Sequence, residues 1–274
     1  MDKCEHKALH KRVKRYLKAV KRVKQDTSPK AIHEFRLASR NLLAVEPLLR
    51  TAGKHGNWHK KVKRWLKVLN KLRDLQVMQE RLHIKGQLET KLQHHVDQAM
   101  HQWKQVRSTL ANRRFKKQLK RSVQAFLQRS QTYPGYFSVT TLSLWWTTLG
   151  KMQNRLDAVQ LDDPTTLHHL RIAYKRLRYL VNTLRDMQVV AENVQTDLKQ
   201  WHEVLGDIQD RQVASVWLKQ QEATQLASEQ IQQAQQLIEH FGERQAQFRQ
   251  TLTQLDATVT HCLLEQLYTL RSDA

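Results

Sequence analysis

The stretch LHHLRIAYKRLRYL, residues 167–180, carries two regular stripes of different character. Its apolar residues, continued just beyond the stretch, recur at steps of three and four, the spacing of a helix with one packed edge: Leu167, Leu170, Tyr174, Leu177, Val181 and Leu184. A basic residue follows most of these positions, about 100° further around the helix: His168, Arg171, Lys175, Arg178 and Arg185. No carboxylate lies between Asp163 and Asp186 to offset the repulsion, roughly 0.2–0.5 kcal/mol per pair of like charges. A bound anion would remove this cost.

The rest of the chain has the same helical character. Only 7 Gly and 4 Pro occur in 274 residues, so turns are few and elements are long. Leu, Gln, Lys, Arg and Ala dominate, and all favour helices. The sequence contains no run of alternating β-branched residues of the kind that is typical of a strand. We therefore expect an all-α protein with ample material for a core.

Caps, prolines and glycines divide the chain into expected helices. The first part holds helices over about 5–24, 29–50 with an interruption or bend near Pro47, 58–83, and 87–129 with a division near 111–112. TYPGYFS, residues 132–138, is the best candidate for a linker. Further helices are expected over about 139–159, 164–187 and 192–221, followed by a long segment to about 270 with a kink at Gly242.

The sequence also repeats itself. SPKAIHEFRLASRNLL, residues 28–43, aligns with DPTTLHHLRIAYKRLR, residues 163–178, and WLKVLNKLRDLQV, residues 65–77, aligns with WHEVLGDIQDRQV, residues 201–213. A cap, a histidine and two cations match in order: Ser28 with Asp163, His33 with His168, Arg36 with Arg171, and Arg40 with Lys175. We predict two pseudo-symmetric four-helix units, residues 1–131 and 138–274, joined by a linker at 132–137.

The positive charge is concentrated in the first half. The chain has a net charge of +22. Residues 1–137 hold 34 Lys and Arg against 9 Asp and Glu, a net charge of +25, and residues 138–274 hold 13 against 16, a net charge of −3. A field of this strength attracts polyanions such as nucleic acid, an anionic membrane surface or a chain of phosphates.

The segments IHEFRLASRNL, LHHLRIAYKRLRYL, LNKLRDLQV and LGDIQDRQV, with the basic stretch ANRRFKKQL, resemble the CHAD family, the conserved histidine α-helical domain. The resemblance covers nearly the whole chain and rests on the duplicated order of the motifs. It implies one domain made of two helical units around a basic central groove or pore. It also implies non-enzymatic binding of inorganic polyphosphate and association with polyphosphate granules. Asn41 and Leu43 stand where the second copy has Arg176 and Arg178, so the first copy is the weaker match.

The expected polyphosphate contacts are the histidines and cations of the repeated helices together with a basic stripe on the first helix: His33, Arg36, Arg40, His168, Arg171, Lys175, Arg178, Lys11, Lys14, Arg15, Lys18 and Arg22. Two alternatives stay open. His33 and His168 either donate to phosphate or are buried structural residues, and the stripe on the first helix is either a ligand wall or a solvated face. Asp74 and Asp210 are expected to pin nearby arginines. The tryptophans, including Trp145 and Trp146, are expected to pack in the core.

Other chemistry has little support. No Gly-rich phosphate loop, zinc-ligand spacing or nucleophile elbow is present, so we expect no catalytic residue, no metal and no cofactor. Two alternatives to polyphosphate binding remain. One is a nucleic-acid-binding protein that uses the same basic surface without specificity for RNA or DNA. The other is a phosphohydrolase, or an accessory or regulator of an enzyme of polyphosphate metabolism.

The remaining signals concern location. The N-terminus lacks the apolar core of a secretory signal, and no apolar run reaches the roughly 18 residues of a membrane span. Cys4 and Cys262 lie at opposite ends of the chain, which fits a reducing compartment better than a disulfide framework. We expect a cytoplasmic protein, on polyphosphate granules where these are present.

Overall fold

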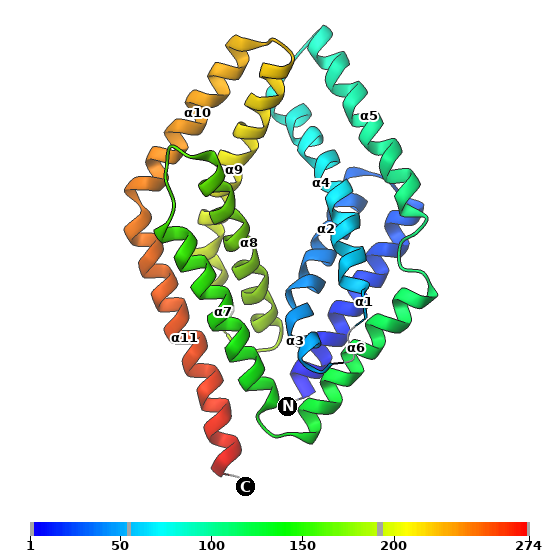
Figure 1. Cartoon of the computed structure of the whole chain (residues 1–274), viewed down its shortest axis with the longest axis vertical. Helices are drawn as coiled ribbons and strands as arrows, with labels where there is room; N and C mark the ends of the chain where they lie inside the picture. Colours follow the sequence, from blue (N-terminus) through cyan, green and yellow to red (C-terminus); the bar gives the residue numbers. More distant parts are fainter. Residues whose placement is uncertain (1–2, 54–55, 191–193, 273–274) are drawn as a thin grey trace.

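The computed structural model describes residues 3–53, 56–190 and 194–272, and side chains within 5–53, 56–190 and 198–269. This part of the chain forms eleven helices and contains no strand. The prediction of an all-α fold is confirmed. Figure 1 shows the helices in two groups that lean against each other, α1 to α6 on one side and α7 to α11 on the other.

The first group contains six helices: α1 (Lys3–Gln25), α2 (Pro29–Ala44), α3 (Glu46–Thr51), α4 (Trp58–Leu82), α5 (Gln87–Arg107) and α6 (Arg113–Thr132). The second group contains five: α7 (Tyr136–Asp157), α8 (Pro164–Asp186), α9 (Val194–Gln220), α10 (Thr224–Glu243) and α11 (Gln245–Ser272). Only residues 133–135 separate α6 from α7, so the connection between the groups is shorter than the predicted linker. That the groups arose by duplication stays a prediction.

Two of the expected helices are interrupted close to the positions that the sequence indicated. The helix expected over 29–50 ends at Ala44, and α3 begins at Glu46, so the chain is interrupted next to Pro47 and not merely bent there. A proline ring clashes with the carbonyl four residues earlier and favours the first turn of a helix, which explains the new start. The long final segment divides at Arg244, close to the expected kink at Gly242.

Side-chain caps begin the two repeated helices, as the sequence predicted. The Ser28 hydroxyl accepts the backbone N–H of Ala31 at 3.3 Å. The Asp163 carboxylate accepts the backbone N–H of Thr165 at 2.8 Å. A proline follows each cap at the first helical position, where it has no hydrogen bond to lose. These caps fix where each row of cations begins.

An apolar core fills both groups of helices. All six residues of the predicted α8 stripe are buried, from Leu167 to Leu184. Aromatic rings form one cluster within each group. The first consists of Tyr16, Phe35, Trp65, Trp103 and Phe115, and the second of Tyr174, Trp201, Phe241 and Phe248. The expectation was wrong for Trp146, which is 50% exposed and donates its indole N–H to Thr260.

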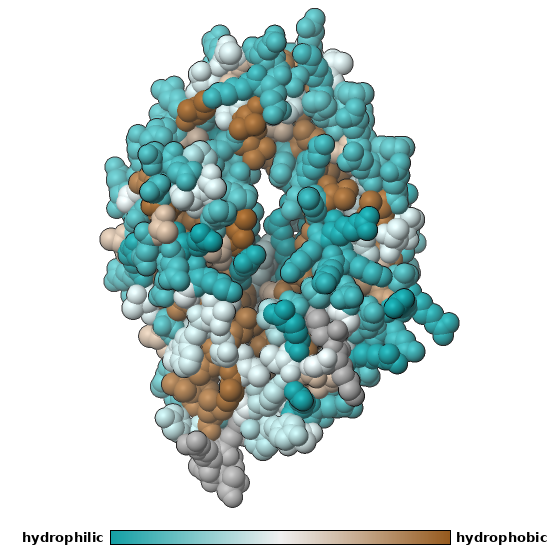
Figure 2. Space-filling model, in the orientation of Figure 1, coloured by the Kyte–Doolittle hydropathy of each residue, from teal (hydrophilic) through white to brown (hydrophobic). Residues whose placement is uncertain are grey.

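The two groups touch at three places. At the first, α2 lies beside α8, and a buried ion pair joins Arg12 of α1 to Asp186 at the end of α8. At the second, α4 lies beside α9, where Arg81 pairs with Asp207 at 2.8 Å. At the third, α7 lies beside α3 and α6, and the Tyr136 hydroxyl donates to Thr51 at 2.7 Å. In Figure 1, α2 and α8 run side by side through the middle of the molecule. Figure 2 shows an opening that passes between the two groups, with hydrophilic residues along much of its edge.

None of the helices in the described part of the chain is long and apolar enough to cross a membrane.

Candidate cation cluster between the two helix groups

The two predicted rows of cations converge where α2 lies against α8. Arg40 of α2 donates to the Tyr179 hydroxyl of α8 at 3.5 Å. The charge of Arg40 also acts on Arg171 and Lys175 of α8. Arg178 and Arg40 both act on His202 of α9. We call the converging side chains the central cluster: Arg36, Arg40, Arg171, Lys175 and Arg178.

Helices α4 and α9 supply polar groups that hold three of these arginines. The Asn70 carboxamide oxygen on α4 accepts from both Arg36 and Arg40, each at 3.3 Å. On α9, Asp210 accepts from Arg171 at 3.4 Å, which confirms the expectation that Asp210 pins an arginine. Each arginine is therefore oriented by a helix of its own group, so the rows are preorganised before a ligand arrives.

Lys175 is the cluster residue whose protonated form is strongly disfavoured by its surroundings. Its pKa is lowered to about 7, first by burial and then by the nearby charges of Arg171, Arg40 and Arg36. Asp210 opposes this effect without reversing it. A lysine whose pKa falls this far has too little negative charge nearby to balance its neighbours.

The other members show the same imbalance. Burial and then Arg40 lower the pKa of Arg36 to about 10, and burial also lowers the pKa of Arg171. On α4, burial raises the pKa of Asp74. The charge of Asp210 also raises it, although Arg36 opposes the shift. Five cations thus face two carboxylates among the described residues, which leaves a surplus of positive charge.

Several donors of the cluster point to no acceptor. The Nε atoms of Arg36, Arg171 and Arg178 are buried and have no hydrogen-bond partner within the part of the chain that the structure describes. Buried donors of charged groups are normally satisfied, and a guanidinium can offer two parallel N–H groups to one oxyanion. The cluster is therefore an incomplete hydrogen-bond network of the kind that an anion completes.

His202 of α9 is a member of the site that the sequence analysis missed. Its pKa is lowered to about 3, first by burial and then by the charges of Arg178, Lys175 and Arg171, so the ring is neutral. Its Nδ1 atom is buried without a partner among the described residues. A signal was present in the sequence: His202 lies one position after Trp201, beside the apolar edge of α9, as His168 lies one position after Leu167 on α8.

The two repeated histidines lie outside the core. Both His33 and His168 are exposed, so the alternative that they are buried structural residues is wrong. The His168 ring bonds the Gln209 side chain of α9. The pKa of His33 is lowered, first by partial loss of water and next by Arg36, which lies one turn further along α2. The histidines therefore stand one turn before the cations of their own helices.

The basic stripe of α1 does not join the central cluster in any described contact. Lys11, Lys14 and Lys18 are exposed, and Arg15 reaches only Asp186 at 3.9 Å. Arg22 pairs with Glu34 of α2 at 2.7 Å. Most of this stripe is therefore a solvated face, one of the two alternatives left open by the sequence, and its role in binding stays a prediction.

Arg12 of α1 is a second residue that the sequence analysis missed. Its side chain is 3% exposed and donates to Asp186 at 2.8 Å, to the Asn182 carbonyl at 2.8 Å and to the Asn41 carbonyl at 3.2 Å. These partners lie on α8 and α2, so Arg12 ties the two helices of the cluster together. A signal was present in the sequence: unlike the nine other Lys and Arg residues of α1, Arg12 lies three residues after Leu9 and four before Tyr16, on the buried edge of the helix.

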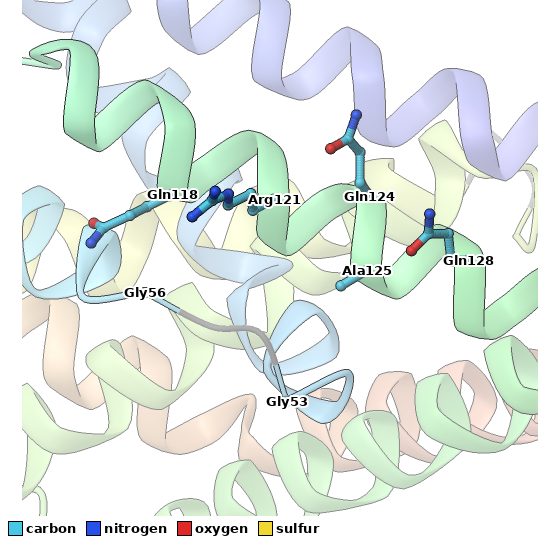
Figure 3. A pocket seen from close by; sticks show the side chains of 7 residues that line it. All are labelled: Gly53, Gly56, Gln118, Arg121, Gln124, Ala125 and Gln128. Carbon is cyan, nitrogen blue, oxygen red and sulfur yellow. The ribbon is translucent and has the colours of Figure 1, made fainter.

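A separate hollow lies along α6. Figure 3 shows its lining residues on α6, Gln118, Arg121, Gln124, Ala125 and Gln128, together with Gly53 and Gly56 of the turn between α3 and α4. None of the central cluster's residues lines this hollow. Residues 54 and 55 of the turn lie outside the described residues. The described part of the chain contains no group of three or more His, Cys, Asp or Glu side chains placed to hold a metal ion.

Comparison with known proteins adds a family to this geometry. The family model described as "CHAD domain" matches residues 7–219, which includes every residue of the central cluster. The fold is similar to the crystal structure of the CHAD domain from the plant Ricinus communis, with a TM-score of 0.63 and 18% identity over 94% of this chain and 92% of that one. None of the curated proteins matches the sequence significantly. The structural likeness extends over α10 and α11, which lie beyond the family match.

Proposed function

Because the chain belongs to the CHAD domain family, we propose that it binds inorganic polyphosphate in the central cluster between α2 and α8, without catalysing a reaction. We place this binding in the cytoplasm, on polyphosphate granules where they form. The inference depends on the cluster's charge and open donors, which call for a ligand that is anionic along its length.

One observation carries the proposal. Arginines from both groups of helices meet around Lys175, and the Nε atoms of three of them are buried with no acceptor within the described residues. A folded protein keeps unbalanced cations and unmet donors when a ligand supplies the missing acceptors. The surplus of charge is positive, so the ligand is an anion.

Polyphosphate suits this arrangement chemically. Every phosphate of the chain offers oxygens that accept parallel N–H groups from a guanidinium, and the chain has no base or sugar that requires recognition. From His168 to Arg178 the row on α8 extends about 15 Å, so it can follow several phosphates of one chain. His33 and His168 would donate to phosphates one turn before the arginines, and Lys11, Lys14, Arg15 and Lys18 would attract the chain from outside.

The test is to neutralise the α8 row and measure affinity for polyphosphate. Changing Arg171, Lys175 and Arg178 to Gln removes three of the chain's 47 basic residues, so the overall field changes little. Each charge-assisted hydrogen bond contributes about 1.5–3 kcal/mol, so we expect affinity to fall at least tenfold. Circular dichroism would verify that the helices persist.

The matched control neutralises three exposed lysines that lie outside the cluster, Lys85, Lys91 and Lys104. We expect only a small loss of affinity from this change. Equal and small losses from both triple variants would mean that diffuse charge binds the ligand. That result would refute the proposal that the cluster is the site.

Nucleic acid is the competing ligand, because its backbone would also satisfy a row of cations. The cluster favours polyphosphate because Tyr179, the aromatic residue that Arg40 contacts, is buried with Arg178 over its ring and cannot stack on a base. We expect polyphosphate to displace RNA and duplex DNA at physiological salt. Tighter binding of RNA under the same conditions would contradict the proposal and favour nucleic acid as the ligand of this site.

A further inference from the structure

We propose that anion binding at the central cluster is coupled to protonation of Lys175, so that the affinity for the anion decreases as pH rises above neutrality. The proposal rests on the function proposed above and adds regulation by pH. The empty site would hold four permanently charged arginines. The occupied site would hold the same four arginines and, in addition, a protonated Lys175.

The position of Lys175 is the first argument. Lys175 follows Arg171 by one turn of α8 and precedes Arg178 by three residues, and α2 places Arg36 and Arg40 opposite. Its side chain is mostly buried, and within the described residues its ammonium group makes no hydrogen bond or ion pair. Every permanent cation of the cluster therefore repels the proton that Lys175 would carry.

The groups that face Lys175 from α4 and α9 do not compensate. Asp210 of α9 is shared between Arg171 at 3.4 Å and Arg81 at 3.8 Å, so its charge is already divided. Asp74 of α4 attracts the Lys175 proton, but it also faces Arg36 and Arg171. His202 of α9 is neutral and adds no negative charge. Within the described residues Lys175 has no ion-pair partner, and unlike the arginines around it, it can lose its charge near neutral pH.

The direction of the coupling follows from these charges. In the empty site the pKa of Lys175 is about 7, so above neutral pH an increasing share of the molecules hold it uncharged. A phosphate chain that enters the cluster supplies negative charge at close range and raises that pKa. Binding therefore takes up a proton wherever the pH lies above the empty-site value and below the occupied-site value.

The range from pH 7 to 9 isolates this event. The arginines stay protonated there, because even the lowered pKa of Arg36 is about 10. His202, with a pKa of about 3, stays neutral unless the ligand raises that value far. The internal phosphates of a long polyphosphate are strongly acidic and do not titrate in this range. Proton uptake by Asp74 would persist in a variant that changes only Lys175, which makes that variant the control.

The experiment is calorimetric titration of the protein with long-chain polyphosphate at pH 8, repeated in buffers of different ionisation enthalpy. The slope of the observed heat against ionisation enthalpy gives the protons taken up per bound protein. We expect between about one half and one proton for the wild type. Affinity should also fall about tenfold between pH 6.5 and pH 8.5, since one coupled proton changes it by at most tenfold per pH unit.

Lys175→Arg is the decisive variant, because a guanidinium keeps its charge throughout this pH range. We expect it to bind polyphosphate at both pH values with little proton uptake and a flatter pH profile. Wild-type binding without proton uptake, or uptake that Lys175→Arg leaves unchanged, would overturn the coupling while the proposed function stands. Absence of binding even at pH 6.5 would refute the proposed function instead.

Discussion

At the scale of single residues, two buried cations are treated in opposite ways. Arg12 donates to one carboxylate and two backbone carbonyls, which compensate its charge in part, although burial still lowers its pKa to about 10. Lys175 lies among arginines with no ion pair among the described residues, and its pKa is about 7. Arg12 serves the fold. Lys175 destabilises the empty fold, which is the behaviour expected of a residue kept for binding.

This contrast predicts that Lys175→Met stabilises the ligand-free protein. The folded pKa of Lys175 lies below the unfolded value near 10.4, so between these values the unfolded chain binds more protons. The cost of the lysine is therefore full at and below pH 7 and fades as pH approaches 10.4. We expect Lys175→Met to raise the free energy of unfolding by about 1–3 kcal/mol at pH 7 and by less at pH 9.

Denaturant unfolding of both proteins at pH 7 and pH 9 would measure this difference. Lys85→Met, at an exposed position, serves as the control and should change stability little at either pH. A destabilised Lys175→Met variant would show that the side chain finds compensation in the fold.

At the scale of helices, α8 is the element that joins fold and site. One edge buries the apolar stripe in the core of its group, and the adjoining edge carries Arg171, Lys175 and Arg178 toward α2. Its first turn is held by the Asp163 cap and by Thr166, whose hydroxyl donates to the Gln160 carbonyl at 2.8 Å. The start of the helix is thus fixed at a point remote from the contact at Asp186.

Removal of the cap should therefore affect stability and leave the site intact. We expect Asp163→Ala to lower the free energy of unfolding by about 1 kcal/mol, because the first backbone N–H groups lose an acceptor. Asp163→Ser, which keeps a capping oxygen, should recover most of the loss. Polyphosphate affinity should change by less than a factor of about three, since the cap contacts no cluster residue. A tenfold loss of affinity in a folded variant would indicate that the cap orients the cation row.

At the scale of the whole molecule, contacts at three places keep the helix groups together. The Arg12–Asp186 pair joins α1 to α8 at one place, and the Tyr136 hydroxyl of α7 donates to Thr51 of α3 at another. At the third place Arg81 pairs with Asp207, and the Trp217 indole N–H of α9 donates to His95 of α5 at 3.0 Å. The opening seen in Figure 2 lies between the groups that these contacts join. The spacing of the two cation rows therefore depends on residues outside the rows.

We predict that Arg12→Met destabilises the protein by about 2–4 kcal/mol, because the variant leaves Asp186 and two carbonyls without their buried donor. It should also weaken polyphosphate binding, since α2 and α8 lose a common anchor. Arg15→Met is the matched control. Arg15 lies 3.9 Å from the same Asp186, but its side chain is 60% exposed, so its loss should change stability by less than about 1 kcal/mol. Equal effects of the two changes in chemical unfolding would contradict a special role for Arg12.

The local sequence determined the helical class, the caps at Ser28 and Asp163, and the buried stripe of α8. Each depends on residues a few positions apart, and the periodicity of a helix converts such spacing directly into a face. The local sequence also placed Arg171, Lys175 and Arg178 on one edge of α8. The same reasoning was wrong for Trp146, because a bulky ring on a helix gives no information about whether another helix covers it.

Only the tertiary structure decided which rows of cations meet. The stripe on α1 and the row on α8 look alike in sequence, yet Lys11, Lys14 and Lys18 face solvent while Lys175 lies among arginines from α2. His202 and Arg12 likewise acquire their roles from residues more than 20 positions away in the chain. The burial of a side chain and the electrostatic effect on its pKa both depend on all of its neighbours in space. The sequence lists the charges, but the packing of α2 against α8 sets the distances between them, and those distances determine the pKa of Lys175.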